Sequence, residues 1–203
     1  MPTPPTIFLI DDDTSFLRSA CRLLRAAGHK VQAFESAREF LAQLSPEMAG
    51  CVIVDLQMPG LNGLELQEAL RKTENPLPVV FLTGQGDIPA TVRAMRLGAE
   101  DFLTKRAPQG ELFQAVDRAL ARDAQERERR NKLRTVRNLF DSLSEREREV
   151  LSHVVRGELN KEIAAHLGVN ERTVKLHRTS ITRKLNVRSV AELTRLCVDA
   201  GLV

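Results

Sequence analysis

Short apolar segments alternate with helical patterns through the first half of the chain, and this alternation most constrains the fold. The apolar segments are residues 6–10, 31–34, 51–54, 79–82 and 101–103, and the helical patterns between them are residues 16–27, 36–44, 64–70 and 90–97. The segment at 51–54 is an unbroken apolar run, which is typical of a strand buried on both faces of a parallel sheet. We therefore predict an α/β fold in which helices cover both faces of a five-stranded parallel sheet.

Polar residues follow the predicted strands at the points where the chain leaves the sheet. They are Asp11, Asp12, Asp55, Thr83 and Lys105. Open α/β sheets bind ligands outside the carboxyl ends of their strands, so we expect these side chains to share one edge. Carboxylates that lie close together repel unless a cation joins them, and oxygen ligands with open positions favour Mg²⁺. With a hydroxyl and an ammonium group nearby, such a site can hold a phosphoryl group.

Each of these residues also has a simpler interpretation when it is taken alone. Asp12 or Asp13 can cap the helix that begins near Thr14. Thr83 can be a turn residue, and Lys105 can be a solvated cation. Their common position at strand ends favours a shared binding site over these separate roles.

Four motifs resemble the receiver domain of two-component response regulators. They are IDDD at residues 10–13, VDLQMPGLNG at 54–63, LTG at 82–84 and FLTK at 102–105, and the resemblance covers residues 5–120. It implies a flavodoxin-like fold with strand order 2-1-3-4-5 and makes Asp55 the phospho-acceptor for a histidine kinase. It also implies that Mg²⁺ is bound by Asp12, Asp55 and the main-chain carbonyl of Gln57, with Asp11 acting through water. Thr83 and Lys105 would contact the phosphoryl group, and Phe102 would be the switch aromatic.

One departure from the receiver pattern follows Lys105. The family usually has a proline there, after a cis peptide bond, whereas this chain has Arg106 and reaches Pro108 only later. A cis bond before a non-proline residue costs roughly 2.5–4 kcal/mol. We therefore expect a trans loop, with Lys105 displaced from the site and Arg106 adding a competing charge.

A phosphatase of the haloacid-dehalogenase type is an alternative for this half of the chain. It also uses a strand-end aspartate, but it needs a second aspartate where Gln57 stands.

Residues 109–138 contain few helix breakers and many charged residues. The pairs that place an acid four residues before a base are Asp123/Arg127, Glu126/Arg130 and Glu128/Lys132. This order is the favourable one on a helix, so we predict that the last receiver helix continues as a helical linker over residues 121–140. A coiled-coil dimer is an alternative, although sustained heptads are absent.

Helix-start and helix-stop signals divide the rest of the chain into four short helices. Capping-box patterns occur at Ser144 with Glu147 and at Ser189 with Glu192, and Asn170 can cap a helix over residues 171–185. Residues 160–167 form a two-turn helix that ends at Gly168. Two short helices joined by a glycine-containing turn are typical of a helix-turn-helix motif.

The helix predicted over residues 171–185 has an apolar face and a basic face. Val174, Ile181 and Leu185 fall on one side, and the other side carries Arg172, Leu176, Thr179 and Arg183, with Lys175 beside them. An exposed leucine among basic residues suits a DNA major groove, where apolar groups meet thymine methyls and Lys or Arg meets guanine. A solvated basic face is the simpler alternative for the helix taken alone.

Three motifs of the same region resemble the LuxR-type DNA-binding domain. They are LSEREREVL at residues 143–151, NKEIA at 160–164 and TVKLH at 173–177, and the resemblance covers residues 141–203. It implies that Lys175, Leu176 and Thr179 face the bases. It also assigns phosphate contacts to residues around Asn160, Lys161, Thr173, His177 and Arg178, and it makes the last helix a dimerisation surface.

A receiver followed by a LuxR-type domain is the arrangement of the NarL/FixJ subfamily of response regulators. The resemblance implies a transcriptional regulator whose partners are a sensor histidine kinase, double-stranded promoter DNA, a second copy of the chain and RNA polymerase. Such a protein takes one phosphoryl group onto its own aspartate, so we do not expect a turnover enzyme. The alternative is a DNA-binding regulator that acts without phosphorylation.

Composition and charge agree with this division into two parts. The chain is 42% hydrophobic and 28% charged, has no apolar run of the roughly 18 residues that span a membrane, and begins without signal-peptide features, so we expect a cytoplasmic protein. Residues 1–108 carry 11 basic and 13 acidic residues, whereas residues 142–203 carry 11 and 8, which weakly favours nucleic acid as the partner of the second part. Cys21, Cys51 and Cys197 are isolated, and we expect buried thiols, not disulfide partners or metal ligands.

Overall fold

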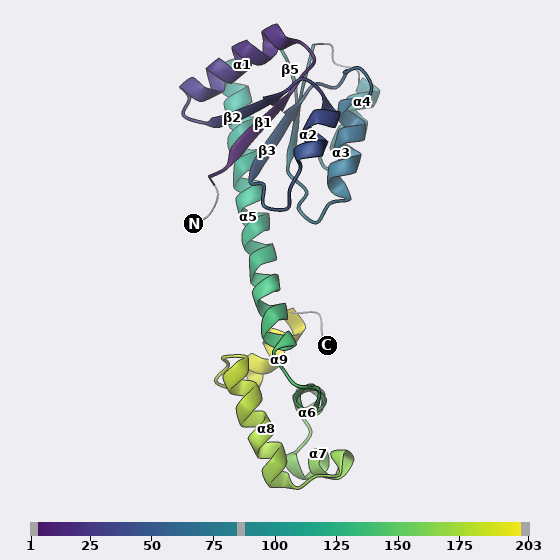
Figure 1. Cartoon of the computed structure of the whole chain (residues 1–203), viewed down its shortest axis with the longest axis vertical. Helices are drawn as coiled ribbons and strands as arrows, with labels where there is room; N and C mark the ends of the chain where they lie inside the picture. Colours follow the sequence, from purple (N-terminus) through teal and green to yellow (C-terminus); the bar gives the residue numbers. More distant parts are fainter. Residues whose placement is uncertain (1–3, 85–87, 200–203) are drawn as a thin grey trace. The chain divides into compact units, whose positions relative to one another are not determined.

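The computed structural model describes residues 4–84 and 88–199, and the chain divides into two compact units, Met1–Arg127 and Glu128–Val203. The first unit contains a five-stranded parallel sheet in the order β2-β1-β3-β4-β5 (Figure 1). Its strands are β1 (Thr6–Ile10), β2 (Lys30–Phe34), β3 (Gly50–Val54), β4 (Val79–Thr83) and β5 (Asp101–Thr104). The predicted sheet and its strand order are therefore confirmed.

Helices cover both faces of this sheet, as predicted (Figure 1). One face is covered by α1 (Thr14–Ala26) and by the first part of α5 (Gln109–Asp141), and the other by α2 (Ala37–Gln43), α3 (Gly63–Arg71) and α4 (Ile88–Arg96). Leu24 of α1 and Ala115 of α5 share a buried core with Ile53 of β3. Phe40 of α2 and Leu66 of α3 lie in a second buried core on the opposite face of the sheet, together with the strand residues whose side chains point to that face.

Gly50 and Asp123 join the start of β3 to α5. The main-chain N–H of Gly50 donates to the buried Asp123 carboxylate at 2.8 Å, and Arg127 contacts the same carboxylate at 2.8 Å. Gly50 has a φ of +134°, and a Cβ added there would lie 1.8 Å from the carbonyl oxygen of Thr6. Only glycine fits this position, because both the backbone conformation and the space exclude a side chain.

The helix α5 runs to Asp141, one residue beyond the predicted end of the helical linker. The predicted ion pairs Asp123/Arg127 and Glu128/Lys132 are present, at 2.8 Å and 2.6 Å. Such pairs stabilise a helix whose outer turns have few apolar contacts.

The second unit contains four helices after the end of α5, among its described residues. They are α6 (Glu145–Val155), α7 (Asn160–Leu167), α8 (Glu171–Lys184) and α9 (Val190–Asp199), and they enclose a core that includes Val150, Ile163, Val174, Ile181 and Leu193. The capping box at Ser144 and Glu147 and the Asn170 cap are present, as predicted. At the start of α9, Glu192 donates its backbone N–H to Ser189, but its carboxylate accepts from Arg188 and not from Ser189.

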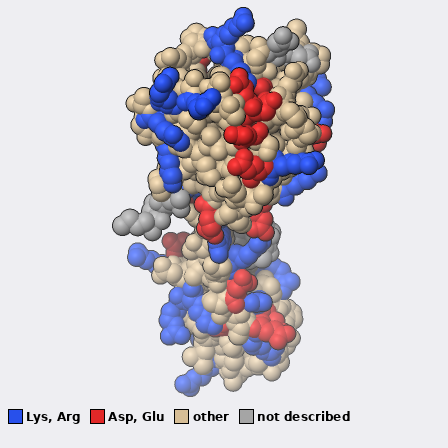
Figure 2. All heavy atoms as spheres, turned by 45° about the horizontal axis from the view of Figure 1, so that its top comes forward, with Lys and Arg blue, Asp and Glu red and all other residues tan. Residues whose placement is uncertain are grey.

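Cysteines and surface charge complete the description of the fold. Cys21, Cys51 and Cys197 are buried free thiols, as predicted, and burial raises the pKa of Cys51 to about 12. On the face shown in Figure 2, acidic side chains of the first unit form a band with basic side chains on either side of it. Within the described part of the chain, every helix is too short or too polar to cross a membrane.

Candidate functional site

Three carboxylates meet at the carboxyl edge of the sheet. Asp11 follows β1 and is 1% exposed, and Asp55 follows β3 and is 7% exposed. One oxygen atom each from Asp11, Asp12 and Asp55 lies within 4.8 Å of the others. Neighbouring parallel strands β1 and β3 pair in register up to Ile10 and Val54, so the next residues of both strands leave the sheet side by side. The predicted convergence of strand-end residues is present in the structure.

The ammonium group of Lys105 bridges two of these carboxylates. Its Nζ lies 2.6 Å from Oδ2 of Asp11 and 2.8 Å from Oδ2 of Asp55. The ring of Phe16 lies beneath it, with the Nζ 4.6 Å from the ring centroid. An ammonium over an aromatic face is attracted by the ring quadrupole, so Phe16 helps to hold Lys105 in the site. No local sequence pattern predicts this contact, because Phe16 and Lys105 lie 89 positions apart.

The expectation that Lys105 lies away from the site is wrong. The peptide bonds of the described residues are all trans, as expected for Arg106 in place of proline. However, the backbone N–H of Lys105 donates to the carbonyl of Thr83 at 2.7 Å, which continues the β4–β5 pairing past the end of the strand. Ala107 then donates to Thr104 at 2.9 Å and turns the chain. Strand pairing therefore directs Lys105 into the site without a cis bond, while Arg106 is exposed to solvent.

Burial and pairing shift the pKa values of the site in different ways. Burial raises the pKa of Asp11, and hydrogen bonds from Lys105 and from the N–H of Asp13 only partly offset this effect. Burial lowers the pKa of Lys105, but hydrogen bonds to Asp11 and Asp55 outweigh it and raise this pKa above its ordinary value. Lys105 is therefore protonated at neutral pH, and its positive charge lies next to Asp55.

Thr83 and Gln57 lie on the same edge, whereas Phe102 lies within β5, in register with Phe81 of β4. Thr83 is 2% exposed at the end of β4, and the backbone N–H of Gln57 lies 3.4 Å from Oδ1 of Asp55. Phe102 of β5 is half-buried and stacks on Phe81 with 5.7 Å between the ring centroids. Asp13 is the N-cap of α1, which is one of the simpler roles considered for it.

Gly63 supports the loop that follows Asp55. It is the first residue of α3, and a Cβ added there would lie 2.4 Å from the carbonyl oxygen of Asp55. The preceding residue, Asn62, caps α3 in a capping box with Glu65. The glycine in the 54–63 motif therefore allows a helix start to approach the backbone of the acidic site.

The helix α8 presents the predicted face to solvent. Val174 and Ile181 are fully buried, whereas Leu176 is 64% exposed. Arg172, Lys175, Thr179 and Arg183 are also exposed or half-exposed, and Thr173 and His177 are half-exposed. An exposed leucine among basic residues is the arrangement that suits a major groove. Lys161 of α7 is exposed, while Asn160 accepts a hydrogen bond from Arg178 at 3.0 Å, so two of the predicted phosphate contacts hold each other in place.

Glu147 fixes α8 against α6 and was predicted only as a helix cap. Its carboxylate accepts from Ser180 at 2.6 Å and from Lys184 at 2.7 Å, in addition to the backbone N–H of Ser144. These hydrogen bonds, with that of Lys184 first, lower the pKa of Glu147 to about 2. The capping-box pattern gave no sign of the contacts to α8, which join residues 33 and 37 positions apart.

Comparison with known proteins identifies a family for each of the two parts of the chain. Residues 7–117 match the family described as response regulator receiver domain, and residues 141–197 match the family described as bacterial regulatory proteins, luxR family. The chain is 42% identical to nodulation protein W of Bradyrhizobium diazoefficiens over 200 residues, which are 98% of this chain and 88% of the relative. It is 37% identical to the transcriptional regulatory protein FixJ of Azorhizobium caulinodans over 202 residues, or 100% of this chain and 96% of the relative.

Two solved structures cover nearly the whole chain. The response regulator StyR is 44% identical with a TM-score of 0.88, and covers 97% of this chain and 99% of its own. Full-length FixJ from B. japonicum is 35% identical with a TM-score of 0.57, and covers 99% of both chains. The chain therefore belongs to the NarL/FixJ subfamily of two-component response regulators, transcriptional regulators in which a receiver domain is followed by a LuxR-type helix-turn-helix domain.

Proposed function

We propose that Asp55 accepts a phosphoryl group from a sensor histidine kinase and that this event controls promoter binding. The observation that carries the proposal is the bridge of Lys105 between Asp55 and Asp11, at 2.8 Å and 2.6 Å. A phosphoryl group on Asp55 carries negative charge, and a fixed ammonium beside it stabilises that charge as it develops. Thr83, buried at the end of the neighbouring strand, would donate its hydroxyl to the same group.

The donor set fits Mg²⁺. Asp11, Asp12 and Asp55 offer carboxylate oxygens within 4.8 Å of one another, and hard oxygen ligands with open positions are those that Mg²⁺ prefers. Asp12, Asp55 and the main-chain carbonyl of Gln57 would bind the ion directly, and Asp11 would act through water. When bound, the ion supplies positive charge that neutralises oxygens of the transferred group. The ammonium group of Lys105, which lies between Asp11 and Asp55, also lowers the repulsion between these two carboxylates.

The signal passes from the acidic site to DNA as a population shift. A phosphoryl group on Asp55 favours the receiver conformation in which Thr83 and Lys105 interact with it most strongly. It shifts the equilibrium only by the difference between its interaction free energies in the two conformations. Phe102, half-buried against Phe81, is the aromatic that moves with Thr83. The shifted state favours a homodimer. The last helices of the two copies form the dimer contact on DNA, and the promoter-bound dimer recruits RNA polymerase.

The division of labour follows the two domains. We assign residues 5–120 to the receiver, 121–140 to a helical linker and 141–203 to DNA binding, with Lys175, Leu176 and Thr179 facing bases. The receiver takes up one phosphoryl group per chain and does not turn over substrate. Because its target is promoter DNA, the protein acts in the cytoplasm. The second candidate is a regulator that binds DNA without phosphorylation and is controlled instead by protein contact or by its expression.

Labelling of Asp55 and DNA binding separate the two candidates. Wild type, Asp55→Asn and the control Asp117→Asn, an exposed aspartate of α5, are treated with a small acyl phosphate donor and Mg²⁺. We expect one phosphate per chain in wild type and the control and none in Asp55→Asn. DNA affinity, measured at fixed salt, should rise on treatment in the two labelled proteins only. Equal labelling of Asp55→Asn would refute the phospho-acceptor, and equal DNA affinity with and without donor would favour the second candidate.

A further inference from the structure

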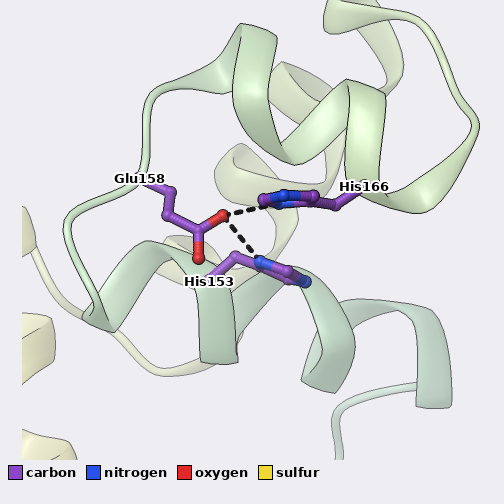
Figure 3. A group of neighbouring side chains, drawn as sticks. All are labelled: His153, Glu158 and His166. Carbon is purple, nitrogen blue, oxygen red and sulfur yellow. Dashed lines mark hydrogen bonds and ion pairs between the residues drawn. The ribbon is translucent and has the colours of Figure 1, made fainter.

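Side chains that can hold a metal ion gather at two places among the described residues, and only one belongs to the receiver site. The other consists of His153, Glu158 and His166, all within the second unit. Both imidazoles point toward the Glu158 carboxylate, from α6 and from α7 (Figure 3). Nδ1 of His153 lies 2.8 Å from Oε2 of Glu158, and Nδ1 of His166 lies 3.0 Å from the same oxygen.

The turn between α6 and α7 creates this convergence. Gly157 ends α6 with a φ of +83°, and its N–H donates to Val154 at 3.0 Å. The N–H of Glu158 then donates to the carbonyl of His153 at 3.2 Å, which places the Glu158 side chain beside the last turn of α6. His166 lies one residue before the end of α7, and its ring stacks on that of His153 with 5.3 Å between centroids. The backbone therefore brings the three groups together.

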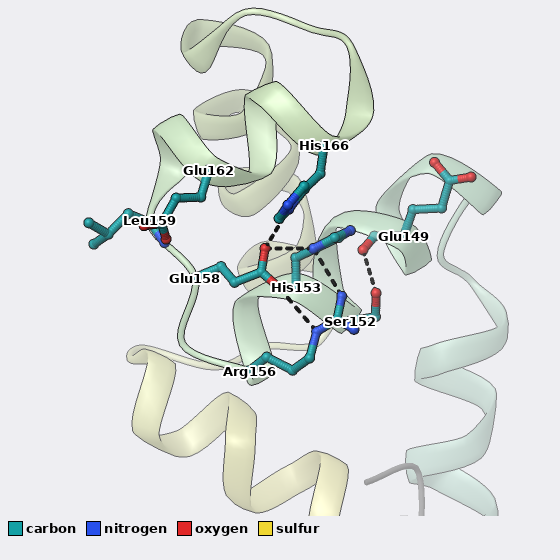
Figure 4. A network of polar contacts seen from close by, with 8 residues as sticks. All are labelled: Glu149, Ser152, His153, Arg156, Glu158, Leu159, Glu162 and His166. Atoms are coloured by element: carbon teal, nitrogen blue, oxygen red, sulfur yellow. Dashed lines mark hydrogen bonds and ion pairs between the residues drawn. The ribbon is translucent and has the colours of Figure 1, made fainter.

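The hydrogen bonds of this group cannot all be satisfied by the protein alone. Nδ1 of His153 contacts Glu158 at 2.8 Å and also Nη2 of Arg156 at 2.9 Å (Figure 4). Arginine only donates, and a carboxylate only accepts. If Nδ1 carries a proton, it faces the donor of Arg156, and if it carries a lone pair, it faces the acceptor of Glu158. One of the two contacts is therefore unfavourable in either tautomer.

We propose that His153, Glu158 and His166 form a binding site for a divalent transition-metal ion of the Zn²⁺ type, with water in the fourth position. Two imidazole nitrogens and one carboxylate oxygen form a donor set that zinc uses in three-ligand sites. Imidazole favours zinc and its neighbours, whereas Mg²⁺ and Ca²⁺ favour oxygen alone. The site therefore differs in metal preference from the all-oxygen cluster of the receiver, and it is independent of phosphorylation at Asp55.

The geometry needs only side-chain adjustment. Ligands at about 2.0–2.2 Å from a tetrahedral ion stand about 3.3 Å apart, and the contacts to Oε2 are 2.8 Å and 3.0 Å. The stacked rings must turn so that both lone pairs point at one ion, and the side chain of His166 is 59% exposed and has room to do so. The side chain of Arg156, which is 58% exposed, would give up its contacts with Glu158 and His153 and turn into solvent.

A bound ion would clamp the helix-turn-helix domain at one point. It would join the last turn of α6, the connecting turn and the last turn of α7, the helix that precedes α8. Ligands that bind only the folded state stabilise it by mass action. The expected effect is therefore a metal-dependent gain in the stability of the second unit.

The test is a Zn²⁺ titration of the full chain in excess Mg²⁺, followed by calorimetry and thermal melting. We expect one Zn²⁺ per chain, a rise in melting temperature, and visible absorption of a tetrahedral complex when Co²⁺ replaces Zn²⁺. His166→Gln and Glu158→Gln should each lower Zn²⁺ affinity by about tenfold or more, since even outer-shell changes at metal sites cost about 10–100-fold. Both residues are partly or fully exposed, so these variants are expected to fold, with circular dichroism as the check.

Two controls separate this site from others. His29→Gln removes a histidine outside the cluster, and Asp55→Asn alters the receiver carboxylates; both should keep the Zn²⁺ stoichiometry and affinity. Loss of Zn²⁺ binding in Asp55→Asn with retention in His166→Gln would overturn the proposal, as would absence of binding in wild type. Neither result bears on whether Asp55 is phosphorylated.

Arg156→Gln provides a variant that should improve binding. It removes a cation that competes for Glu158 and His153, and two positive charges a few ångströms apart repel. We expect its Zn²⁺ affinity to rise several-fold, a gain that a general loss of structure would not produce. Unchanged or weaker binding in Arg156→Gln would contradict an ion at these ligands.

Discussion

Nζ of Lys105 lies 2.8 Å from Oδ2 of Asp55, although arginine and not proline follows the lysine. The pairing of β5 with β4 continues through the N–H of Lys105, which donates to Thr83. The position of the ammonium thus depends on the sheet and on its two carboxylate partners. The residue after it lies outside these contacts, with its side chain in solvent.

Lys105→Ala and Arg106→Ala should therefore behave differently. A hydrogen bond to a charged group contributes about 1.5–3 kcal/mol, so loss of the ammonium should slow labelling of Asp55, or weaken the phosphate-dependent gain in DNA affinity, by about tenfold or more. Arg106→Ala, which removes an exposed side chain, should leave both unchanged. Labelling rates and DNA affinities at one salt concentration measure these effects. An equal loss in both variants would show that general positive charge, not the Lys105 contact, matters.

Gly50→Ala should strongly destabilise the first unit. The new Cβ would meet the Thr6 carbonyl at 1.8 Å, at a φ that side chains rarely adopt, and Gly50 could no longer hold its bond to Asp123 unchanged. Backbone strain of this kind costs on the order of 1–3 kcal/mol, before the clash is counted. Gly110→Ala in α5, where an added Cβ has open space, is the matched control and should not destabilise. Denaturant unfolding of the two variants tests this difference, and similar midpoints would contradict it.

Lys175→Ala and Lys161→Ala should separate base contacts from phosphate contacts. Loss of a base contact costs about 1–3 kcal/mol of discrimination, whereas loss of a phosphate contact weakens all sequences and lowers the salt slope by about 1. We expect Lys175→Ala to reduce binding to a duplex selected with the full chain more than binding to random DNA. Lys161→Ala should reduce both alike. If Lys175→Ala also weakens both equally, Lys175 contacts phosphate and the assignment of the base-facing side is wrong.

The predictable parts of this protein are those written in local patterns. The strands, the helix caps at Asn170 and Ser144, and the strand-end aspartates all follow from periodicity and from the geometry of parallel sheets. The predicted position of Lys105 is wrong, because the pairing with Thr83 continues past the strand end and no local sequence pattern marks this continuation. Long-range side-chain contacts left no signal either, and Phe16 beneath Lys105 is an example.

The two-fold role of Glu147 leads to a prediction about pH. The carboxylate joins the start of α6 to α8 through Ser180 and Lys184, and its pKa in the folded protein is about 2, below the ordinary value of 4.5. A depressed folded-state pKa adds stability that is fully present above about pH 4.5 and is lost as the pH falls toward 2. Lys184 is one-third exposed, so solvent screens part of the interaction, and we expect a contribution of about 1–3 kcal/mol.

Glu147→Gln keeps the shape of the side chain and removes its charge, so it should lower the free energy of unfolding at neutral pH. The difference from wild type should shrink as the pH is lowered from about 6 to about 3, because the glutamate of the unfolded wild-type chain is then protonated, while the folded-state carboxylate is protonated only near pH 2. Glu149→Gln is the matched control, since this glutamate is 42% exposed and pairs with Arg146 in an exposed contact; its effect should stay within about 0.5 kcal/mol. Denaturant unfolding of the three proteins at both pH values measures these differences. A Glu147→Gln difference that does not change with pH would show that its packing, not its charge, holds α8 in place.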